Sequence, residues 1–488
     1  MSCNRSRNSV VNRKHKRRLF ATFAMAVLAV LPLVFVGCDS AKTNVPIELS
    51  TNPHVVMIVL DTLRADTVGC YGGPKGISPE IDALAAKGVR FDNVVAPSNW
   101  TKPSWAGMLT ARYPRSLGIY SEIGECLPDD AVTLAESFQA AGYKTYGATA
   151  NPNINSAFNY QQGFDEHLDS HVIWDWMEIT VGESGNQSAN EARLAPATEL
   201  YKNAVDWAAK QDGAPCYIQV CAMEMHEYLR GQFSLNRPEF KKEFSSLATP
   251  EREYYQALKQ SSIDLQQFLR DLRALPGWHD ALVIVTSDHG EGLSDHPDVP
   301  RSAHHGGVMY DSNLHVPLII HRPGAIPQGR VIENSVRLLD LAPTILEIVG
   351  LPPMQDVDGV SLMPLIDGAD SVEGMPEFFV SESYLRDLDK IAIESRTWRF
   401  IENHDQKKST NSQLGHMNLE ALQKIGVAQN GIATDQIDSQ AAIAATLRDH
   451  LQAWKAEHPK AQPTKCGIPL TDEEREQLGA IGYIGDED

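Results

Sequence analysis

Two aspartates and a histidine stand directly after apolar stretches of the chain, in positions suited to binding a cation. Asp61 follows "VVMIVL", and Asp288 and His289 follow "LVIVT". Two carboxylates and one imidazole form a suitable ligand set for one divalent cation. Each also has an ordinary interpretation, since Asp61 could cap a helix and "SDHGE" could be a polar turn. Their shared position after predicted strands favours the metal interpretation.

The segment "SNWTKPSWAGMLTARYP" (98–114) carries a hydroxyl, a lysine and a predicted helix start in close succession. Pro103 suits the first turn of a helix, which puts Thr101 just ahead of the helix N-terminus. Backbone N–H groups at such an end favour an anion. Lys102 is a candidate to stabilise the oxygens of that anion. The alternatives are an ordinary turn hydroxyl for Thr101 and a surface lysine for Lys102.

An alternation of strands and helices must position these residues. Apolar runs rich in β-branched residues predict buried parallel strands, and amphipathic runs predict the helices between them. The alternation predicts an α/β fold with a doubly wound, mostly parallel sheet and helices on both faces. Ligands bind at the carboxyl ends of the strands in such a sheet. Asp61, His226 and the Asp288–His289 pair each follow a strand and should therefore converge. The predicted strands are 54–62, 143–150, 215–223 and 280–291, the predicted helices are 78–88, 133–142, 194–210 and 254–275, and the runs 315–324 and 338–350 complete the pattern.

The pattern of hydrophobic and polar residues changes after about residue 370. The runs 377–385 and 390–404 predict strands of a smaller sheet, 441–458 predicts a terminal helix, and the Gln/Asn/Ser-rich piece 404–440 predicts irregular structure. We therefore expect a catalytic α/β domain over 53–370 and a smaller C-terminal α+β subdomain over 371–488.

The composition is that of an acidic enzyme. The chain has 488 residues, 42% of them hydrophobic, and a formal net charge of −20. This length is ample for a buried core and predicts more than one compact unit. The strong negative charge argues against nucleic acid as a partner, because proteins that bind it carry basic patches.

The N-terminus has the pattern of an export signal. A basic stretch precedes an apolar run from Leu19 to Gly37. Gly37-Cys38 resembles the cleavage site of bacterial lipoproteins, in which the cysteine becomes lipidated. The alternative is an uncleaved anchor helix, since about 20 apolar residues can span a bilayer. Residues 1–38 are thus predicted to be a lipoprotein signal and 39–52 a linker. We expect an exported, membrane-anchored protein of the cell envelope, on its periplasmic side or at the cell surface.

Cysteine usage does not predict a disulfide scaffold. Apart from Cys3 and Cys38 the chain has five cysteines, so at least one is free if the others pair within the chain. Cys216 and Cys221 lie five residues apart on one predicted strand, which puts their side chains on opposite faces. These two should not pair with each other.

Six motifs occur in an order that resembles the sulfatase branch of the alkaline phosphatase superfamily. They are "DTLRADTVGCYG", "APSNWTKPSWAGMLTARYP", "MHEY", "TSDHGE", "HHGGVMYDSNLHVPLII" and "DLAPTILEIVGL". The resemblance covers about residues 53–370. It implies an α/β fold in which a metal-held nucleophile attacks a sulfuryl or phosphoryl centre.

The resemblance also implies roles for single residues. Thr101 matches the nucleophile, which binds the metal together with Asp61, Asp288 and His289. His226 matches a leaving-group acid or substrate contact. His305 matches a substrate-facing lysine or histidine, with its neighbour His304 as the alternative.

The chain departs from the family pattern at several of these motifs. Sulfatases carry Cys or Ser at the position of Thr101, and that residue is oxidised to formylglycine. Their partner arginine is here Trp105, the second aspartate of their first motif is Thr62, the proline of their histidine motif is Glu227, and "GATANPNIN" replaces their Gly-Lys-Trp-His segment. A formylglycine hydrate can release sulfate by breaking its own C–O bond, but a threonine ester must be cleaved at the central atom.

These features predict a metal-dependent hydrolase or transferase that cleaves phosphate mono- or diesters, or sulfate esters, through Thr101. One divalent ion, Mn²⁺, Zn²⁺ or Ca²⁺, is expected, and a glycan or a lipid is a candidate carrier of the ester. Two alternatives stay open: a sulfuric ester hydrolase that works without formylglycine, and an inactive sulfatase-like protein that binds glycans.

Overall fold

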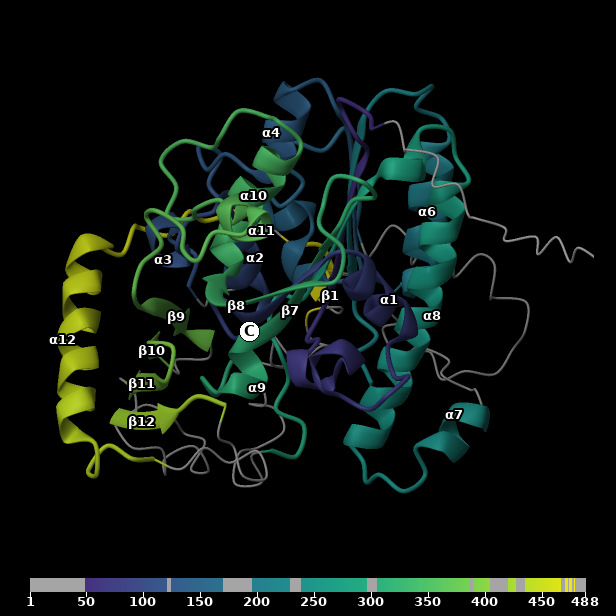
Figure 1. Ribbon diagram of the computed structural model, residues 1–488. Helices are drawn as coiled ribbons and strands as arrows, with labels where there is room; N and C mark the ends of the chain where they lie inside the picture. The colour runs from purple at the N-terminus through teal and green to yellow at the C-terminus, as the bar shows by residue number, and fades with distance from the viewer. Residues whose placement is uncertain are drawn as a thin grey trace, which may run out of the picture. The chain divides into compact units, whose positions relative to one another are not determined.

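The structure is a computed structural model (Figure 1). It describes residues 49–120, 124–169, 195–228, 238–295, 305–385, 389–403, 420–426, 435–466, 470–472, 474, 475 and 478. Residues from Ile47 onward form one compact unit. The export signal predicted for residues 1–38, the lipidation of Cys38 and the role suggested for His304 concern residues outside the described ranges. They stay predictions, as do the domain boundaries at 53 and 371.

A large mixed sheet carries the site residues. Its order is β4-β3-β5-β1-β6-β7-β2-β8. β7 runs antiparallel to both of its neighbours, β6 and β2, whereas the other pairings are parallel. The strands are β1 (Val55–Leu60), β2 (Val89–Val95), β3 (Lys144–Thr149), β4 (Glu166–Leu168), β5 (Cys216–Ala222), β6 (Leu282–Thr286), β7 (His315–His321) and β8 (Arg330–Arg337). The predicted doubly wound, mostly parallel α/β fold is confirmed.

The strands that the apolar pattern located are those buried on both faces. β1 and β6 are buried along their whole length. β2 ("VRFDNVV") and β8 ("RVIENSVR") were not predicted, and both alternate buried with more exposed positions. Their sequences are more polar because they lie toward one edge of the sheet, where one face is only partly covered.

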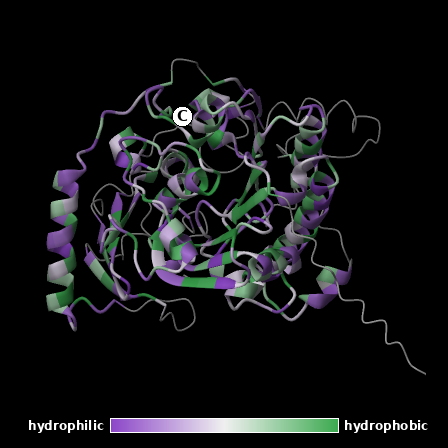
Figure 2. Cartoon of the chain, turned by 45° about the horizontal axis from the view of Figure 1, so that its top comes forward, coloured by the Kyte–Doolittle hydropathy of each residue, from purple (hydrophilic) through white to green (hydrophobic). Residues whose placement is uncertain are grey.

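Helices cover both faces of this sheet (Figure 1). α1 (Pro79–Lys87), α6 (Ala197–Ala208) and α8 (Glu251–Arg273) lie together on one side, and α2 (Thr101–Thr110), α4 (Leu134–Ala140), α10 (Leu341–Ile348) and α11 (Met363–Asp367) lie on the other. Short helices connect them: α3 (Pro114–Leu117), α7 (Pro238–Glu243) and α9 (Asp311–Leu314). Figure 2 shows the hydrophobic residues concentrated in the central strands. Among the helices of the described ranges, none is both long and apolar enough to cross a bilayer.

The carboxyl ends of β3, β5, β1 and β6 lie next to one another, because these strands are consecutive neighbours in the sheet. Asp61 follows β1 directly, and its backbone N–H still bonds to the carbonyl of Ala222 at 2.9 Å. Asp288 and His289 follow β6. The polar loops after these strands therefore meet at one edge of the sheet.

A second, antiparallel sheet lies in the C-terminal region. Its order is β12-β11-β10-β9, formed by β9 (Phe379–Ser383), β10 (Lys390–Glu394), β11 (Trp398–Asn403) and β12 (Glu420–Lys424). The terminal helix α12 (Ala441–Glu457) packs on β10 and β11. This bears out the expected smaller α+β region.

One part of the C-terminal prediction is wrong. β12 falls inside 404–440, where irregular structure was expected. Its sequence "EALQK" carries no strand pattern, and the strand exists because its backbone pairs with β11 from Trp398↔Lys424 to Glu402↔Glu420. Backbone pairing of this kind leaves no signal in the residue types.

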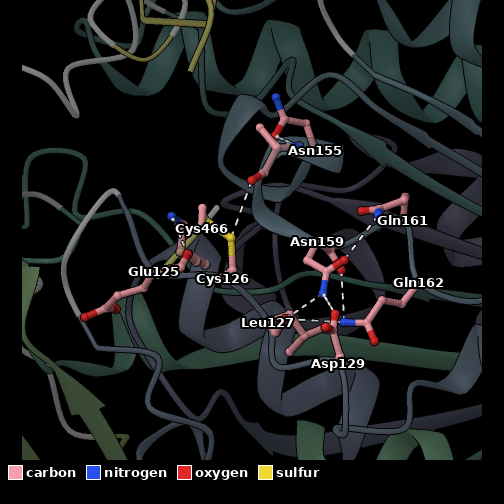
Figure 3. The surroundings of a disulfide bond; sticks show 11 residues. Glu125, Cys126, Leu127, Asp129, Asn155, Asn159, Gln161, Gln162 and Cys466 are labelled. Atoms are coloured by element: carbon pink, nitrogen blue, oxygen red, sulfur yellow. Dashed lines mark hydrogen bonds between the residues drawn. A yellow bond between two sulfur atoms is a disulfide. The ribbon is translucent and has the colours of Figure 1, made fainter. Parts of the chain in front are cut away.

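A disulfide joins Cys126 to Cys466 across 340 residues (Figure 3). Backbone bonds support it on both sides: the N–H of Cys126 donates to Thr464 O at 2.9 Å, and the N–H of Cys466 donates to Gly124 O at 3.0 Å. Cys70, Cys216 and Cys221 are free thiols. The expectation that the two cysteines of β5 do not pair with each other is confirmed.

Candidate active site

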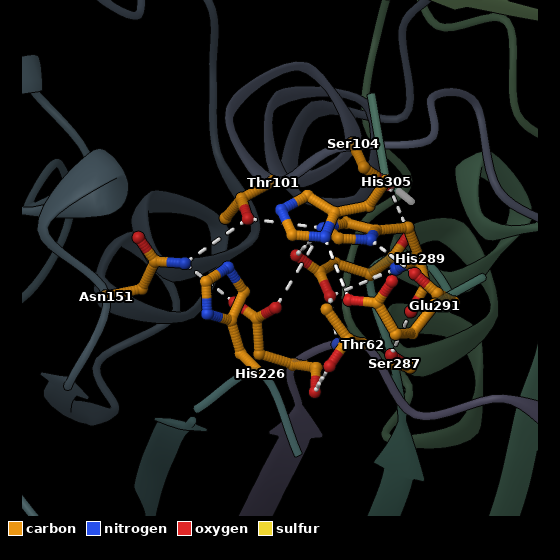
Figure 4. Close-up of polar contacts among 12 residues, drawn as sticks. Thr62, Thr101, Ser104, Asn151, His226, Ser287, His289, Glu291 and His305 are labelled. Atoms are coloured by element: carbon orange, nitrogen blue, oxygen red, sulfur yellow. Dashed lines mark hydrogen bonds and ion pairs between the residues drawn. The ribbon is translucent and has the colours of Figure 1, made fainter. Parts of the chain in front are cut away.

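A cluster of three potential metal ligands lies at the carboxyl ends of β1 and β6 (Figure 4). One ligand atom from each of Asp61, Asp288 and His289 lies within 4.8 Å of the other two. All three side chains are fully buried. The structure thus brings together the residues that the sequence placed after two separate strands, and their role as metal ligands stays a prediction.

Each carboxylate in the cluster has one oxygen engaged and one oxygen without a hydrogen bond. Asp61 Oδ2 accepts from Asn151 at 2.6 Å, and Asp288 Oδ1 accepts from the backbone N–H groups of Thr62 at 3.4 Å and His289 at 3.0 Å. The other two oxygens, Asp61 Oδ1 and Asp288 Oδ2, are buried and have no hydrogen-bond partner among the described residues. Buried polar atoms of this kind are costly unless something else binds them.

The imidazole of His289 is oriented to present one nitrogen to these oxygens. Its Nδ1 lies 2.9 Å from the carbonyl of Gly290, which can only accept, so Nδ1 carries the proton. Nε2 then faces the cluster, 3.8 Å from Asp61 Oδ1 and 3.6 Å from Asp288 Oδ2. A backbone bond to the second ring nitrogen is the usual way in which a metal-binding histidine is held.

The electrostatics of the cluster favour a bound cation. Burial raises the pKa of Asp61 well above its usual range, and the nearby carboxylates of Asp288 and Glu227 raise it further. Negative charges gathered in a buried site are strongly unfavourable unless a positive charge compensates them. The donor set, two unpartnered carboxylate oxygens and one imidazole nitrogen, therefore fits one divalent ion.

Thr101 lies within reach of this cluster. It is buried, and it is the first residue of α2, whereas the sequence placed it just ahead of the helix. Pro103 sits in the first turn, as expected. Thr101 Oγ1 lies 3.3 Å from His289 Nε2 and 3.2 Å from Asn151 Nδ2. The Thr101 hydroxyl therefore contacts one predicted metal ligand, His289, directly. It also shares the amide of Asn151 with a second predicted ligand, Asp61.

Lys102 is buried, so its interpretation as a surface lysine is wrong. Its ammonium contacts the carbonyl of Glu125 at 3.2 Å and lies 3.4 Å from the centre of the Phe158 ring. Burial lowers the pKa of Lys102 to about 7. These contacts face the disulfide region, because Glu125 precedes Cys126. A contact of Lys102 with the transferred group stays a prediction.

Two histidines, each held by a glutamate, stand beside the cluster (Figure 4). His226 Nδ1 lies 2.6 Å from Glu227, and His305 Nδ1 lies 2.9 Å from Glu291. The ring centres of the two histidines are 4.9 Å apart, and that of His305 lies 5.4 Å from that of His289. His226 Nε2 is buried, and none of the described residues forms a hydrogen bond with it. The structure thus gathers both predicted histidines at the site.

The comparison with protein families agrees with this geometry. A sulfatase family model matches residues 53–351, which is more than half of the chain. This chain belongs to the sulfatase family.

Several known proteins are similar to this chain at low sequence identity. An ulvan-active sulfatase of Formosa agariphila is 24% identical over 386 residues, which cover 75% of each protein. The phosphonate monoester hydrolase of Agrobacterium radiobacter has a similar structure, with a TM-score of 0.62 and 20% identity over 83% of this chain and 96% of that chain. A protein solved with its substrate D-glucosamine-2-N,6-O-disulfate aligns with a TM-score of 0.62 and 16% identity. The alignment covers 84% of this chain and 99% of that chain. The two structural similarities show a shared fold.

The structure shows the surroundings of two residues that differ from the sulfatase pattern, Trp105 and Thr62. Trp105, in place of the arginine, is buried in the hydrophobic core. Thr62, in place of the second aspartate, donates from its hydroxyl to the carbonyl of Asp61 at 2.7 Å. Thr62 also has a φ of 59°, an uncommon value for a β-branched residue, and such backbone strain concentrates at functional sites.

Sequence reasoning missed three polar residues of the site in this sulfatase-family chain: Asn151, Glu227 and Glu291. Asn151 lies in "GATANPNIN", two residues after the end of β3, so its position after a strand was an available signal. The two glutamates lie within the motifs "MHEY" and "TSDHGE", and Glu227 was noted only as a replacement for proline. Their partners became visible only in the folded chain.

Proposed function

We propose that this chain is a metal-dependent ester hydrolase of the sulfatase family that uses Thr101 as its nucleophile. The observation that carries the proposal is the position of Thr101 Oγ1, buried and 3.3 Å from His289 Nε2, at the edge of the group formed by Asp61, Asp288 and His289. An alcohol beside a ligand set of this kind is a candidate for activation by coordination.

Asp61, Asp288, His289 and Thr101 would hold the ion. A divalent cation bound there lowers the pKa of a coordinated hydroxyl and offsets negative charge on the transferred group. Within the described ranges, each of the two carboxylates has one oxygen without a hydrogen-bond partner. Three monodentate side chains and the threonine oxygen favour Zn²⁺ or Mn²⁺ over Ca²⁺, which takes about 6–8 oxygen ligands and often uses bidentate carboxylates.

The reaction that these residues support has two displacements. Thr101 gives its hydroxyl proton to solvent, and its oxygen forms a bond to phosphorus or sulfur. The bond to the leaving oxygen breaks, and that oxygen keeps the electron pair and takes a proton from His226 or His305. Water then attacks the same centre and gives a proton to the histidine that protonated the leaving oxygen, the bond to Thr101 breaks, and the threonine oxygen takes a proton from solvent. An acceptor alcohol in place of water would make the second step a transfer.

We favour a phosphoryl centre, in a diester or a phosphonate ester. A threonine ester cannot release its group by breaking its own C–O bond in the way that a formylglycine hydrate does, so the central atom must be attacked a second time. The similarity to a phosphonate monoester hydrolase supports this choice. A sulfuric ester hydrolase is the second candidate, and its support is the relatives named as an ulvan-active sulfatase and a protein with a sulfated glucosamine substrate.

The test compares Thr101→Ala with Thr110→Ala, the same substitution in the same helix. Thr110 is the last residue of α2, and its hydroxyl donates to the carbonyl of Ala106. Hydrolysis of bis(4-nitrophenyl) phosphate and 4-nitrophenyl sulfate is measured with Mn²⁺, Zn²⁺ or Ca²⁺. We expect Thr101→Ala to lose about 10³-fold or more in kcat, and Thr110→Ala to stay close to the parent.

Three outcomes would contradict parts of the proposal. Full activity of Thr101→Ala rules out the nucleophile. Faster turnover of the sulfate ester than of the phosphate diester favours the sulfuric ester hydrolase. No turnover of either ester, together with no bound metal, favours a protein that only binds sulfated or phosphorylated glycans.

We also propose that the protein is exported and anchored by a lipid on Cys38. The disulfide between Cys126 and Cys466 supports export, because disulfides persist in oxidising compartments. Mass spectrometry of the N-terminal peptide from the membrane fraction tests this. A peptide that begins at a diacylated Cys38 is expected, and an unmodified peptide spanning Gly37 and Cys38 would rule the lipid anchor out.

A further inference from the structure

We infer that Asn151 is a further catalytic residue, which donates one hydrogen bond to the attacking oxygen of Thr101 and one to the metal ligand Asp61. The inference rests on the proposed function, because it assigns to Asn151 a role toward the nucleophile. It adds a donor that the family motifs do not supply, since "GATANPNIN" matches none of them.

The orientation of the Asn151 amide is set by the backbone around it. Asn151 is the N-cap of the short helix η3 (Pro152–Ile154), and its Oδ1 accepts from the backbone N–H of Asn153 at 2.9 Å. A backbone N–H is always a donor, so the oxygen of the amide must lie on that side. The NH₂ group therefore points the other way, toward the site (Figure 4).

Both hydrogens of that NH₂ group have an acceptor in the site. Nδ2 lies 2.6 Å from Asp61 Oδ2 and 3.2 Å from Thr101 Oγ1. Asn151 is fully buried, as are both of its partners. A fixed donor aimed at an oxygen in a buried site stabilises negative charge on that oxygen, because no solvent must reorganise. Asn151 therefore favours the deprotonated form of the Thr101 oxygen.

The second hydrogen bond determines how Asp61 can bind a cation. With Oδ2 engaged by Asn151, Oδ1 is the oxygen of Asp61 that lacks a hydrogen-bond partner in the described part of the chain. Asp61 would then hold an ion through one oxygen. Removal of the amide frees Oδ2 and permits bidentate binding, which suits Ca²⁺ better than it suits smaller ions with fewer ligands.

The test uses Asn151→Ala and Asn151→Ser, with Asn155→Ala as the matched control. Asn155 caps the next short helix, η4 (Ser156–Phe158), through the same kind of bond, from Ala157 N to its Oδ1 at 3.1 Å. Its amide donates to Glu474, so it contacts neither Thr101 nor Asp61. Serine can still cap η3, but it is too short to reach the site, so Asn151→Ser separates folding from chemistry.

The first measurement is kcat for bis(4-nitrophenyl) phosphate with the metal-loaded enzyme. We expect both Asn151 variants to lose about 10²–10³-fold in kcat, the range seen when one oxyanion donor is removed, with KM changed far less. In a Thr101→Ala background, Asn151→Ala should cause no further loss. Asn155→Ala should stay within a few-fold of the parent.

The second measurement needs no turnover. Metal-free parent and variants are titrated with Mn²⁺, Zn²⁺ and Ca²⁺, and binding is followed by thermal unfolding. We expect Asn151→Ala and Asn151→Ser to bind Ca²⁺ more tightly relative to Zn²⁺ than the parent does, by about 10-fold, the lower end of the effects measured for residues that hold metal ligands. Asn155→Ala should keep the parent's preference.

Two results would overturn the role of Asn151 while leaving the nucleophile in place. The first is full activity of folded Asn151→Ser combined with an inactive Thr101→Ala. The second is an equal loss in Asn155→Ala, which would make the effect one of loop structure. An active Thr101→Ala would instead overturn the proposed function, and the metal preference would then decide separately whether Asn151 limits Asp61 to one oxygen.

Discussion

At the scale of single residues, the site is built so that each polar side chain uses one atom for support and presents another. Asp61, Asp288 and His289 are each held by one atom, leaving Oδ1, Oδ2 and Nε2 facing the others. His226 follows the same rule, with Nδ1 bonded to Glu227 and Nε2 lacking a partner among the residues that the structure describes. Orientation by a neighbouring group is what turns a polar residue into a ligand or a proton donor.

The two glutamates provide a way to decide which histidine protonates the leaving group. We expect Glu227→Gln to lower kcat about 10–100-fold if His226 is the acid, because the neutral amide no longer stabilises the protonated ring. The loss should be larger for a methyl ester, a poor leaving group that needs the proton, than for a 4-nitrophenyl ester. Glu291→Gln is the matched variant for His305. Equal sensitivity of both variants on both esters would contradict the assignment of a single acid.

The buried Lys102 side chain should make the free energy of unfolding depend on pH. Its pKa is lowered to about 7 by burial, below the value of 10.5 for an unfolded lysine. Between these values the unfolded state binds the extra proton, so the free energy of unfolding rises with pH in this window, and the penalty of the buried charge is fully present below pH 7. We expect Lys102→Met to stabilise the protein most near pH 6, with a gain that fades toward pH 10. Denaturant unfolding checks this, with exposed Lys144→Met as the control, and a gain that does not vary with pH would contradict it.

At the scale of elements, the site depends on a loop that packs tightly against a neighbouring segment. Ser104 of α2 donates to the carbonyl of Asp288 at 2.6 Å, and Ser287 donates to that of His289 at 2.7 Å. Gly290 comes next, and its N–H donates to the carbonyl of Asn313 at 2.8 Å. The turn after β6 is therefore fixed by side chains and backbone from both α2 and the segment before β7.

Gly290 is required for that close approach. A Cβ at this position would lie 1.9 Å from the carbonyl oxygen of Ser312. We expect Gly290→Ala to lower the free energy of unfolding by about 1–3 kcal/mol, the usual cost of overpacking, and to weaken metal binding because His289 moves. Urea unfolding and metal titration measure both effects. Gly124→Ala is the control, since a Cβ there meets no atom of the described residues within 4 Å. Equal stability of the two variants would contradict the packing argument.

At the scale of the whole chain, the C-terminal tail returns to the catalytic region. Besides the disulfide, the N–H of Ala461 donates to the carbonyl of Arg115 at 2.9 Å, and Glu474 accepts from Asn155 at 3.4 Å. Asn155 belongs to the same loop as Asn151, so the last described residues of the tail support the segment after β3. The end of the chain is thus part of the structure around the site.

The disulfide should contribute strongly to stability because it closes a loop of 340 residues. We expect the double variant Cys126→Ser, Cys466→Ser to lose about 2–5 kcal/mol, the range for a native disulfide. Denaturant midpoints of the oxidised protein, the reduced protein and the variant are compared. Cys70→Ser, which removes a free thiol, is the control. If reduction leaves the midpoint of the parent unchanged, the contribution of the bridge to stability is refuted.

The sequence alone was enough to locate β1, β5 and β6, to place Asp61, Asp288 and His289 after strands, and to predict that the loops would converge. These inferences depend on local patterns, in which buried strands are apolar and polar ligands follow them. The antiparallel direction of β7, the strand β12, the bridge from Cys126 to Cys466 and the contacts of Asn151 were decided only by the tertiary structure. Each of these features joins residues that lie far apart in the chain, through backbone pairing or a single side-chain contact. Such contacts depend on where residues lie in space, which the residue types along the chain do not reveal.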